Sequence, residues 1–440
     1  MAIAIISPQD ADYHGRIESL LGLLRSGTLT AADTATDLDV PAIVADIIAQ
    51  VRDQGDAAVC ALTNRLDRAA ITPQTLRVSA ADLASAHASA DPALMTVLRA
   101  ARDNIQAYQE HIRHRDPEPL RRGGRTLGLR YTPMQRAAIY VPGGRALYPS
   151  TVLMTAVPAL VAGVEEIVMV SPPSGGEIAP LALALAHELG IREVYRCGGA
   201  VAIAALALGT ATIPVVDKIV GPGNAFVAEA KRQLFGRVGI DAIAGPSEVV
   251  IVADAEADPA CIAADLLAQA EHDPGSAVLI TPAPALATAV ADELARRLAG
   301  LERAAAIAAA LERYGAIIVT PDLTSACALA DRFATEHLEL HTADDAACLT
   351  RIRHAGAIFL GRYSPVSLGD YYAGPSHVLP TGGTARFFGP LSANDFLKAS
   401  STIHYDAAAL AEDGPGVQAF AAYEGLTAHG AAVAARHPSP

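Results

Sequence analysis

The strongest constraint on the fold is a repeated alternation of short apolar segments with segments of helical periodicity. In the middle of the chain, four apolar runs each end in a loop of glycine or proline, and each loop opens a helical segment. The predicted strands cover residues 137–141, 166–170, 193–195 and 218–220. This order is typical of a parallel sheet with helices on both faces. Right-handed crossovers then place the glycine loops along one edge, where open α/β sheets bind ligands.

A second round of alternation follows and indicates a second, similar α/β unit. Its predicted strands cover residues 249–252, 277–281, 316–320 and 357–360. Residues 1–130 are predicted to be mainly helical, and the basic, proline-containing stretch 113–125 is expected to be a linker. From about residue 381 the chain is less apolar and less regular, which predicts a small appended domain with a disordered tip at 436–440.

Composition narrows the class of protein. At 440 residues the chain is too long for one ordinary core, so two or more domains are expected. The formal net charge of −14 argues against a nucleic-acid partner, which needs a basic surface. No run of about 18 uninterrupted apolar residues occurs, and the N-terminus lacks the basic segment of a signal peptide. Five cysteines without CxxC spacing are typical of reduced thiols, so we expect a cytoplasmic protein without a membrane partner.

Four short polar islands in the second half of the chain carry groups that bind metals or move protons. They are Gln-Ala-Glu-His at 269–272, Glu-His at 336–337, Gly-Asp-Tyr at 369–371 and Glu-Gly-Leu-Thr-Ala-His at 424–429. Gln269 and His272 lie three residues apart in a predicted helix and so share a face. With Asp370 and His429 they form a set of amide, imidazole and carboxylate donors that suits zinc or manganese. Each island alone is also typical of a helix end or a turn, so a metal site requires that they converge.

Glu336 and His337 lie where a helix is predicted to pass into a strand, and they form a pair suited to acid–base catalysis. A histidine with a pKa near neutrality can accept a proton from an alcohol as hydride leaves, and a carboxylate can activate water. No Gly-x-Gly-x-x-Gly fingerprint follows any predicted strand. The loops 141–144 and 221–224 still offer glycine-rich backbone at helix N-termini, where phosphate binds.

In these motifs the chain resembles the histidinol dehydrogenase family over nearly its whole length. The resemblance rests on ordered segments at residues 140–144, 220–227, 243–249, 269–272, 335–339, 369–381 and 424–429. It implies a zinc enzyme that oxidises L-histidinol to L-histidine through an aldehyde, the last step of histidine biosynthesis, with reduction of two NAD. It also implies an α/β fold of two similar aldehyde-dehydrogenase-like three-layer α/β/α units with parallel sheets, plus small terminal domains.

The resemblance also implies a division into domains. A helical extension would cover 1–35, and an NAD-binding α/β unit would cover 137–246. A catalytic, metal-binding α/β unit would combine 36–136 with 247–380. The family is a homodimer with shared active sites, so the C-terminal domain 381–440 is expected to reach into the partner subunit.

Roles for individual residues follow from the resemblance as well. One zinc ion per subunit would be bound by Gln269, His272, Asp370 and His429. Glu336 and His337 would be the catalytic proton-transfer pair, and Tyr140 and Asn224 would contact NAD. The substrate L-histidinol would be contacted by Ser247, Gln269, His272, His337, Asp370, Glu424 and His429. Where the family commonly has a glutamine in contact with NAD, this chain has Val201, so NAD binding is expected to be weaker or altered.

The chemistry of histidinol fits these residue types. Its amine and imidazole can chelate a metal with open positions, which fixes the alcohol carbon beside the nicotinamide. His337 is expected to take the hydroxyl proton, and Glu336 to activate the water that attacks the aldehyde. Two alternatives stay open at this point: an NAD-dependent dehydrogenase of the same family for another small polar alcohol, and a metal-binding scaffold without turnover.

Overall fold

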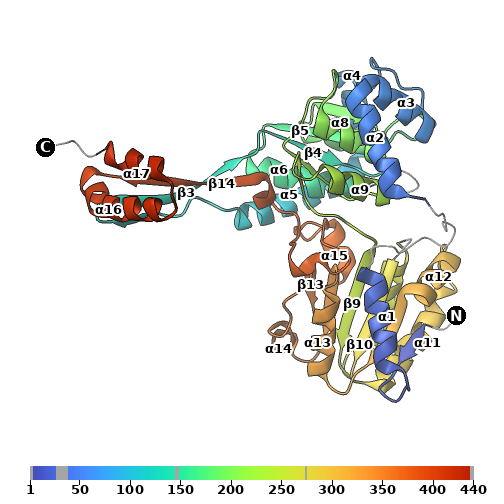
Figure 1. Ribbon diagram of the computed structural model, residues 1–440. Helices are drawn as coiled ribbons and strands as arrows, with labels where there is room; N and C mark the ends of the chain where they lie inside the picture. Colours follow the sequence, from blue (N-terminus) through green and yellow to red (C-terminus); the bar gives the residue numbers. More distant parts are fainter. Residues whose placement is uncertain (1–2, 26–37, 144–147, 273–274, 437–440) are drawn as a thin grey trace.

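The computed structural model describes residues 3–25, 38–143, 148–272 and 275–436. Figure 1 shows two α/β bodies and an arm that projects from them and carries the C-terminal helices. Each body is built around a parallel sheet, and an antiparallel sheet forms the arm. The prediction of two α/β units with parallel sheets is confirmed. The segment 26–37 and the last residues of the predicted tip, 437–440, lie outside the described residues.

The first body contains a five-stranded parallel sheet of order β6-β5-β4-β7-β8. Its strands are β4 (Arg136–Tyr140), β5 (Glu166–Ser171), β6 (Glu193–Arg196), β7 (Lys218–Val220) and β8 (Gly239–Ile240). One face is covered by α6 (Pro149–Ala162) and α7 (Pro180–Glu188), and the other by α8 (Gly199–Leu208) and α9 (Ala225–Leu234). All four predicted strands are present. The two-residue β8 was not predicted, because it is too short to show a period.

The N-terminal helices cover this same sheet. They are α2 (Val40–Gln54), α3 (Asp56–Leu66), α4 (Ala80–Ala88) and α5 (Pro92–Ile112). The apolar stripe of α2, with Val44, Ile47 and Val51, shares a core with α8, and Met95 and Ile105 of α5 share the core on the opposite face. The predicted grouping of 36–136 with 247–380 is therefore corrected. Periodicity indicates which face of a helix is buried, but not which sheet buries it.

The second body contains a six-stranded parallel sheet of order β1-β11-β10-β9-β12-β13. Its strands are β1 (Ala4–Ile6), β9 (Ser247–Ala253), β10 (Gly275–Thr281), β11 (Gly315–Val319), β12 (His337–His341) and β13 (Ala357–Leu360). One face is covered by α10 (Pro259–Ala270), α11 (Pro284–Leu298) and α12 (Ala304–Tyr314), and the other by α1 (Tyr13–Arg25) and α13 (Leu323–Phe333). Two short helices, α14 (Asp345–Leu349) and α15 (Val366–Tyr371), follow β12 and β13 in turn.

The N-terminal segment belongs to this second body. β1 pairs in parallel with β11, and α1 buries Ile17 and Leu21 against the same sheet. Within the predicted helical extension at 1–35, the described residues 3–25 form an edge strand and a covering helix, so the prediction is corrected for that part. A strand of three residues has too little alternation to be seen in the sequence, and its partner lies about three hundred residues away, so only the folded chain reveals the pairing.

The arm is built from segments far apart in the chain. β2 (Leu120–Arg122), β3 (Arg125–Pro133) and β14 (Leu397–Tyr405) form its sheet, and α16 (Ala407–Tyr423) and α17 (Thr427–Ala434) follow. Two 3-10 turns, Thr384–Arg386 and Ala393–Phe396, precede β14. All nine residues of β3 pair with β14, so the predicted C-terminal domain 381–440 needs a strand from outside that range. The stretch predicted as a linker, 113–125, contains β2.

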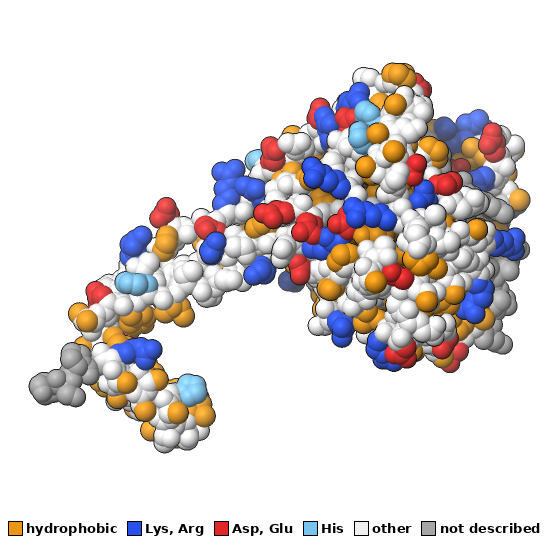
Figure 2. All heavy atoms as spheres, turned by 90° about the horizontal axis from the view of Figure 1, so that it is seen from above, with side chains coloured by type: hydrophobic (Ala, Val, Ile, Leu, Met, Phe, Trp, Pro, Cys, Tyr) orange, Lys and Arg blue, Asp and Glu red, His pale blue; other side chains and the backbone are white. Residues whose placement is uncertain are grey.

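The arm exposes many apolar side chains. Phe420 is 69% exposed, Tyr423 93% and Ile403 75%, and α17 buries none of its residues. Figure 2 shows apolar side chains gathered along the arm where it stands clear of the two bodies. A contiguous exposed apolar surface of this kind is typical of a region that another protein chain covers.

Two expectations from composition can be compared with the structure. No described helix is both long and apolar enough to cross a membrane. All five cysteines are free thiols, and four of them are buried, in line with the prediction of reduced, buried cysteines.

Candidate active site and metal centre

A cavity of about 1990 Å³ lies between the two bodies. The first body lines it with residues at the carboxyl ends of its strands and the N-termini of its helices, among them Tyr140, Gly143, Gly198, Val201 and Asn224. The second body lines it with residues at the start of β9 and β12 and near the ends of α10 and α15, among them Ser247, Gln269, His272, Glu336, His337 and Asp370. All predicted site residues except Glu424 and His429 therefore meet at one cavity.

The Glu336–His337 pair is buried and held by the backbone of the neighbouring strand. Glu336 is 6% exposed and His337 is 3% exposed. The amide of Glu248 donates to Oε2 of Glu336 at 2.9 Å. Nδ1 of His337 lies 3.1 Å from the carbonyl of Glu248, and since a carbonyl only accepts, Nδ1 carries the proton. Nε2 of His337 lies 3.6 Å from Oδ1 of Asp370 and has no hydrogen-bond partner among the described residues.

Burial and neighbouring charges set the protonation of these groups. Burial raises the pKa of Glu336. Burial alone would lower the pKa of His337, but the charges of Glu336 and Asp370 outweigh it and raise that pKa to about 9. Burial alone would raise the pKa of Asp370, but the nearby imidazole of His337, 3.6 Å away, outweighs burial and lowers that pKa. Coupled, buried ionisable groups in a cleft are typical of a catalytic site.

Gln269, His272 and Asp370 present candidate metal ligands to the cavity. Gln269 is 3% exposed, yet neither its amide oxygen nor its amide nitrogen has a partner among the described residues. Unpartnered buried polar groups are rare and need a ligand, ion or water to explain them. Nδ1 of His272 lies 3.3 Å from the carbonyl of Gln269, which leaves Nε2 for another partner. The amide oxygen, imidazole nitrogen and carboxylate together fit a zinc ion.

Glu424 and His429 do not reach the cavity of their own chain. Glu424 follows α16, and His429 lies on α17, at the end of the arm (Figure 1). Both side chains are exposed, and neither lines the cavity. Within one chain, three of the four predicted metal ligands come together and the fourth lies on the arm.

Two residues in or next to the site were not among the predicted site residues. Glu248 holds the Glu336–His337 pair through its backbone, a role that any residue type can fill and that leaves no signal in the sequence. His377 lines the cavity, with Nδ1 3.0 Å from the carbonyl of Asp370 and Nε2 3.4 Å from Oγ1 of Thr151. Burial lowers the pKa of His377. Its position seven residues after Asp370 was the available signal.

The part of the cavity formed by the first body suits a dinucleotide. The N-termini of α8 and α9 both open onto it. Oδ1 of Asn224 caps α9 by accepting from two amides at 3.1 and 3.2 Å. The Tyr140 hydroxyl accepts from the amide of Gly199 at 3.1 Å, at the start of α8. Helix N-termini that open onto a cavity are natural sites for phosphate, because the helix dipole favours negative charge there. Val201, 1% exposed, packs into the core beside this loop.

A buried ion pair holds the loop that leads into α9. Nζ of Lys231 donates to Oδ1 of Asp241 and to the carbonyl of Gly221, both at 2.6 Å. Oδ2 of Asp241 accepts from the amide of Gly221 at 2.7 Å. Gly221 has a φ of +117°, and a Cβ there would lie 2.3 Å from the carbonyl oxygen of Tyr140. Both the conformation and the space therefore require glycine at this position.

A separate group of metal-type side chains does not overlap the predicted ligand set. Asp265, Glu339 and His341, called here the Glu339 cluster, have ligand atoms within 4.8 Å of one another. Asp265 lines the cavity and Glu339 is fully buried. The Glu339 carboxylate lies 3.1 Å from Nε2 of His341 and accepts from the amide of Val366 at 3.1 Å, so both of its oxygens are already engaged within the protein.

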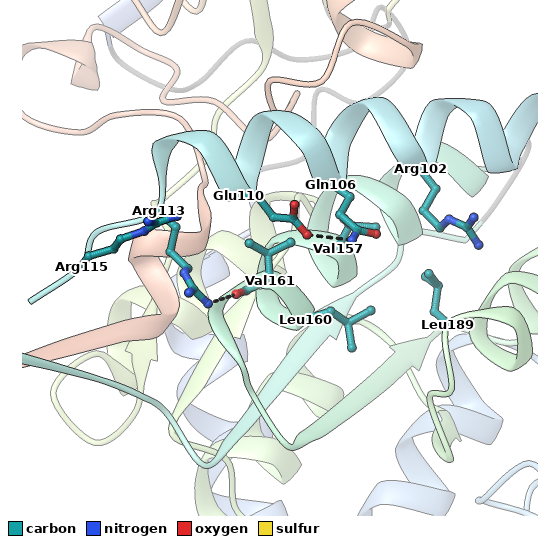
Figure 3. Close-up of a pocket in the computed structure, with 9 residues that line it drawn as sticks. All are labelled: Arg102, Gln106, Glu110, Arg113, Arg115, Val157, Leu160, Val161 and Leu189. Atoms are coloured by element: carbon teal, nitrogen blue, oxygen red, sulfur yellow. Dashed lines mark hydrogen bonds between the residues drawn. The ribbon is translucent and has the colours of Figure 1, made fainter.

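A smaller cavity of about 380 Å³ lies between α5 and α6 (Figure 3). Arg113 donates to the carbonyl of Val161 at 2.9 Å, and Gln106 donates to Glu110 at 2.8 Å. Arg102 forms ion pairs with neighbouring carboxylates. None of the predicted site residues lines this smaller cavity.

Comparison with known proteins agrees with this geometry. The family model described as histidinol dehydrogenase matches residues 30–437. A histidinol dehydrogenase of Rhodopirellula baltica is 51% identical over 90% of this chain and 86% of its own length, and one of Ruegeria pomeroyi is 50% identical over 98% of both. The crystal structure of histidinol dehydrogenase from Elizabethkingia anophelis matches with a TM-score of 0.90 and 31% identity, over 99% of this chain and 98% of that one. The chain therefore belongs to the histidinol dehydrogenase family.

Proposed function

We propose that the chain oxidises L-histidinol to L-histidine through histidinaldehyde, with reduction of two NAD, as the last step of histidine biosynthesis. Membership of an NAD-dependent dehydrogenase family supports this activity. The observation that carries the proposal is the convergence of three metal-type donors and the Glu336–His337 pair on one cavity, opposite two helix N-termini. Such an arrangement can hold a polar alcohol beside a dinucleotide.

The proposed cofactor besides NAD is one zinc ion per subunit. Gln269, His272 and Asp370 would hold it, with His429 as the fourth ligand. The unpartnered amide of Gln269 supports this assignment, because a buried amide without a partner is unfavourable unless something binds there. A zinc ion held by these residues would orient the amine and imidazole of the substrate and would offset the charge of Asp370, which would favour a neutral His337.

The chain's own residues account for the proton transfers. Nε2 of His337, which faces the cavity without a partner, accepts the hydroxyl proton while hydride passes from the alcohol carbon to NAD. Its Nδ1–H stays bonded to the carbonyl of Glu248, which fixes the ring. Glu336 then accepts a proton from the water that adds to the aldehyde. His337 serves again when the hydrated aldehyde gives up its hydride to a second NAD.

A homodimer with shared sites is the proposed assembly. Glu424 and His429 lie on an arm that its own bodies do not cover, and the exposed Phe420 and Tyr423 lie beside them. In a dimer the arm would bring Glu424 to the partner's substrate and His429 to the partner's zinc. A cytoplasmic location is proposed because all five cysteines are free thiols.

The deciding experiment counts NADH per substrate. Purified, zinc-loaded protein is given limiting L-histidinol and excess NAD, and we expect two NADH for each histidinol consumed. Turnover of a different small polar alcohol but not of histidinol would favour the other dehydrogenase assignment. Zinc uptake without NADH from any tested alcohol would instead support the non-catalytic scaffold.

Shared sites can be tested by mixing two inactive variants. His272→Ala and His429→Ala are unfolded and refolded together, so that half of the dimers carry one variant of each kind. In a shared-site dimer, each mixed molecule has one intact site, and about a quarter of wild-type activity returns. If both ligands came from the same chain, the mixture would stay inactive.

A further inference from the structure

The Glu339 cluster connects the three elements that carry the proposed catalytic and metal-binding side chains. β12 carries His337 and Glu339, and residues two apart on a strand point to the same face of the sheet. α10 carries Asp265 and Gln269, which at a spacing of four share one side of the helix. α15 begins with Val366 and carries Asp370. Asp265 therefore lies about one helical turn from Gln269, and Val366 about one helical turn from Asp370. Glu339 lies two strand positions from His337.

Glu339 lies at the centre of these contacts. It is 0% exposed, and its Oε2 lies 3.1 Å from Nε2 of His341. Its Oε1 accepts from the amide of Val366 at 3.1 Å. Pro365 precedes α15 and offers no side-chain cap, so Glu339 satisfies an amide that the helix itself leaves free. One carboxyl group thus links β12 to the start of α15.

Asp265 extends this link to α10. A carboxylate oxygen of Asp265 lies within 4.8 Å of one of Glu339. Burial and the nearby charge of Glu339 raise the pKa of Asp265 to about 7. When Asp265 carries its proton, it can donate to the Glu339 carboxylate, so that the two groups attract each other. Gln269 lies one helical turn beyond Asp265, and His272 follows directly after the helix.

The hydrogen bonding distinguishes this cluster from the proposed metal site. The Gln269 amide and Nε2 of His337 have no hydrogen-bond partners among the described residues. In the Glu339 cluster, by contrast, both carboxylate oxygens of Glu339 and Nε2 of His341 are engaged within the protein. We propose that Asp265, Glu339 and His341 are positioning residues that fix α10 and α15 against β12 and so hold Gln269, His272 and Asp370 together; this inference rests on the zinc site proposed above.

The test measures zinc affinity rather than turnover. Full-length, metal-free protein is titrated with zinc alone against a chromophoric chelator. Glu339→Ala and Asp265→Ala should each raise the Kd for zinc by about 10- to 100-fold, as loss of groups that orient ligands does. Glu339→Gln keeps an oxygen for the Val366 amide and should restore most of the affinity. The matched control is Leu338→Ala, on the same strand but in the opposite core, which should lower the Tm and leave the Kd unchanged.

The outcomes separate this inference from the proposed function. If wild-type protein binds no zinc, or binds it equally well after His272→Ala, the metal centre itself is wrong. If His272→Ala abolishes binding while Glu339→Ala and Asp265→Ala bind as wild type does, the positioning role is overturned. A second zinc per chain that disappears in Glu339→Ala would also overturn it, because the cluster would then be a metal site. Should Glu339→Ala fail to fold, Asp265→Ala, whose side chain is less buried, decides.

Discussion

Replacing Gln269 by leucine should strengthen the metal-free protein while removing its response to zinc. The amide of Gln269 is buried with both of its polar atoms unpartnered in the described structure. Taken as one unsatisfied buried group, the amide costs about 1–3 kcal/mol, and leucine of similar size removes that cost. For a body of this size, about 1 kcal/mol shifts Tm by about 2–4 °C, so Gln269→Leu should raise the Tm of the metal-free protein by roughly 2–12 °C.

The assay is thermal unfolding followed by circular dichroism, with chelator and with excess zinc. A ligand at about 1,000 times its Kd adds about 4 kcal/mol of stability to a protein that binds it. Wild type should therefore gain stability from zinc, and Gln269→Leu should gain far less. Gln269→Leu should therefore raise the Tm in chelator and lower it, relative to wild type, in excess zinc. Both effects together are expected only if the Gln269 amide is a metal ligand that is unpartnered in the metal-free protein.

Gln109 supplies a matched control. It is also fully buried with an unpartnered Nε2, but its Oε1 accepts from the amide of Ala393 at 2.8 Å. Gln109→Leu leaves that amide without an acceptor, so it should not match the gain of Gln269→Leu, and its zinc response should be that of wild type. A metal-free Gln269→Leu protein with a lower Tm than wild type, or one that zinc still stabilises fully, would refute the reasoning.

Three further predictions concern the acid–base pair and the loop before α9. His337→Asn should keep wild-type zinc content, measured by metal analysis, while kcat falls by about 10²–10⁴-fold, the contribution of a positioned base; lost zinc would mean that His337 is a ligand. Lys231→Met leaves the carboxylate of Asp241 buried without its cationic partner, so KM for NAD should rise about tenfold or more while KM for histidinol stays constant. Equal changes in the two KM values would exclude a local effect on the loop before α9. Gly221→Ala should raise KM for NAD and lower the Tm, since a residue strained at this φ costs about 1–3 kcal/mol and its Cβ meets Tyr140; an unchanged KM for NAD would count against the loop's role.

Local sequence patterns were sufficient to predict most of the helices and strands of the two α/β bodies. The apolar strands of both sheets, the helix from Pro259 and the amphipathic α2 are visible as periodicity, because burial of one face imposes a repeat on the residues of that face. The short motifs carry the family identity, since metal donors, a proton-transfer pair and glycine loops leave recognisable residue types. The family comparison confirms that part of the interpretation.

Long-range packing could not be predicted in the same way. Helices α2–α5 cover the first sheet instead of the second, β1 joins the edge of the second sheet, and β3 crosses to pair with β14. An apolar stripe shows that one face of a helix must be buried, but it does not show which sheet or helix buries that face. The arm illustrates the same limit, because its exposed apolar residues point to a covering chain that the residue pattern alone does not identify.

The same distinction between local and long-range information applies to the candidate site. The sequence was sufficient to select Gln269, His272, Glu336, His337 and Asp370 as candidates, because amide, imidazole and carboxylate groups bind metals and transfer protons. Tertiary structure alone decided that they share one cavity and that backbone groups of Glu248 hold the Glu336–His337 pair. It also decided that Glu339 links the surrounding elements, since such a link depends on distances between segments that the chain brings together only when it folds.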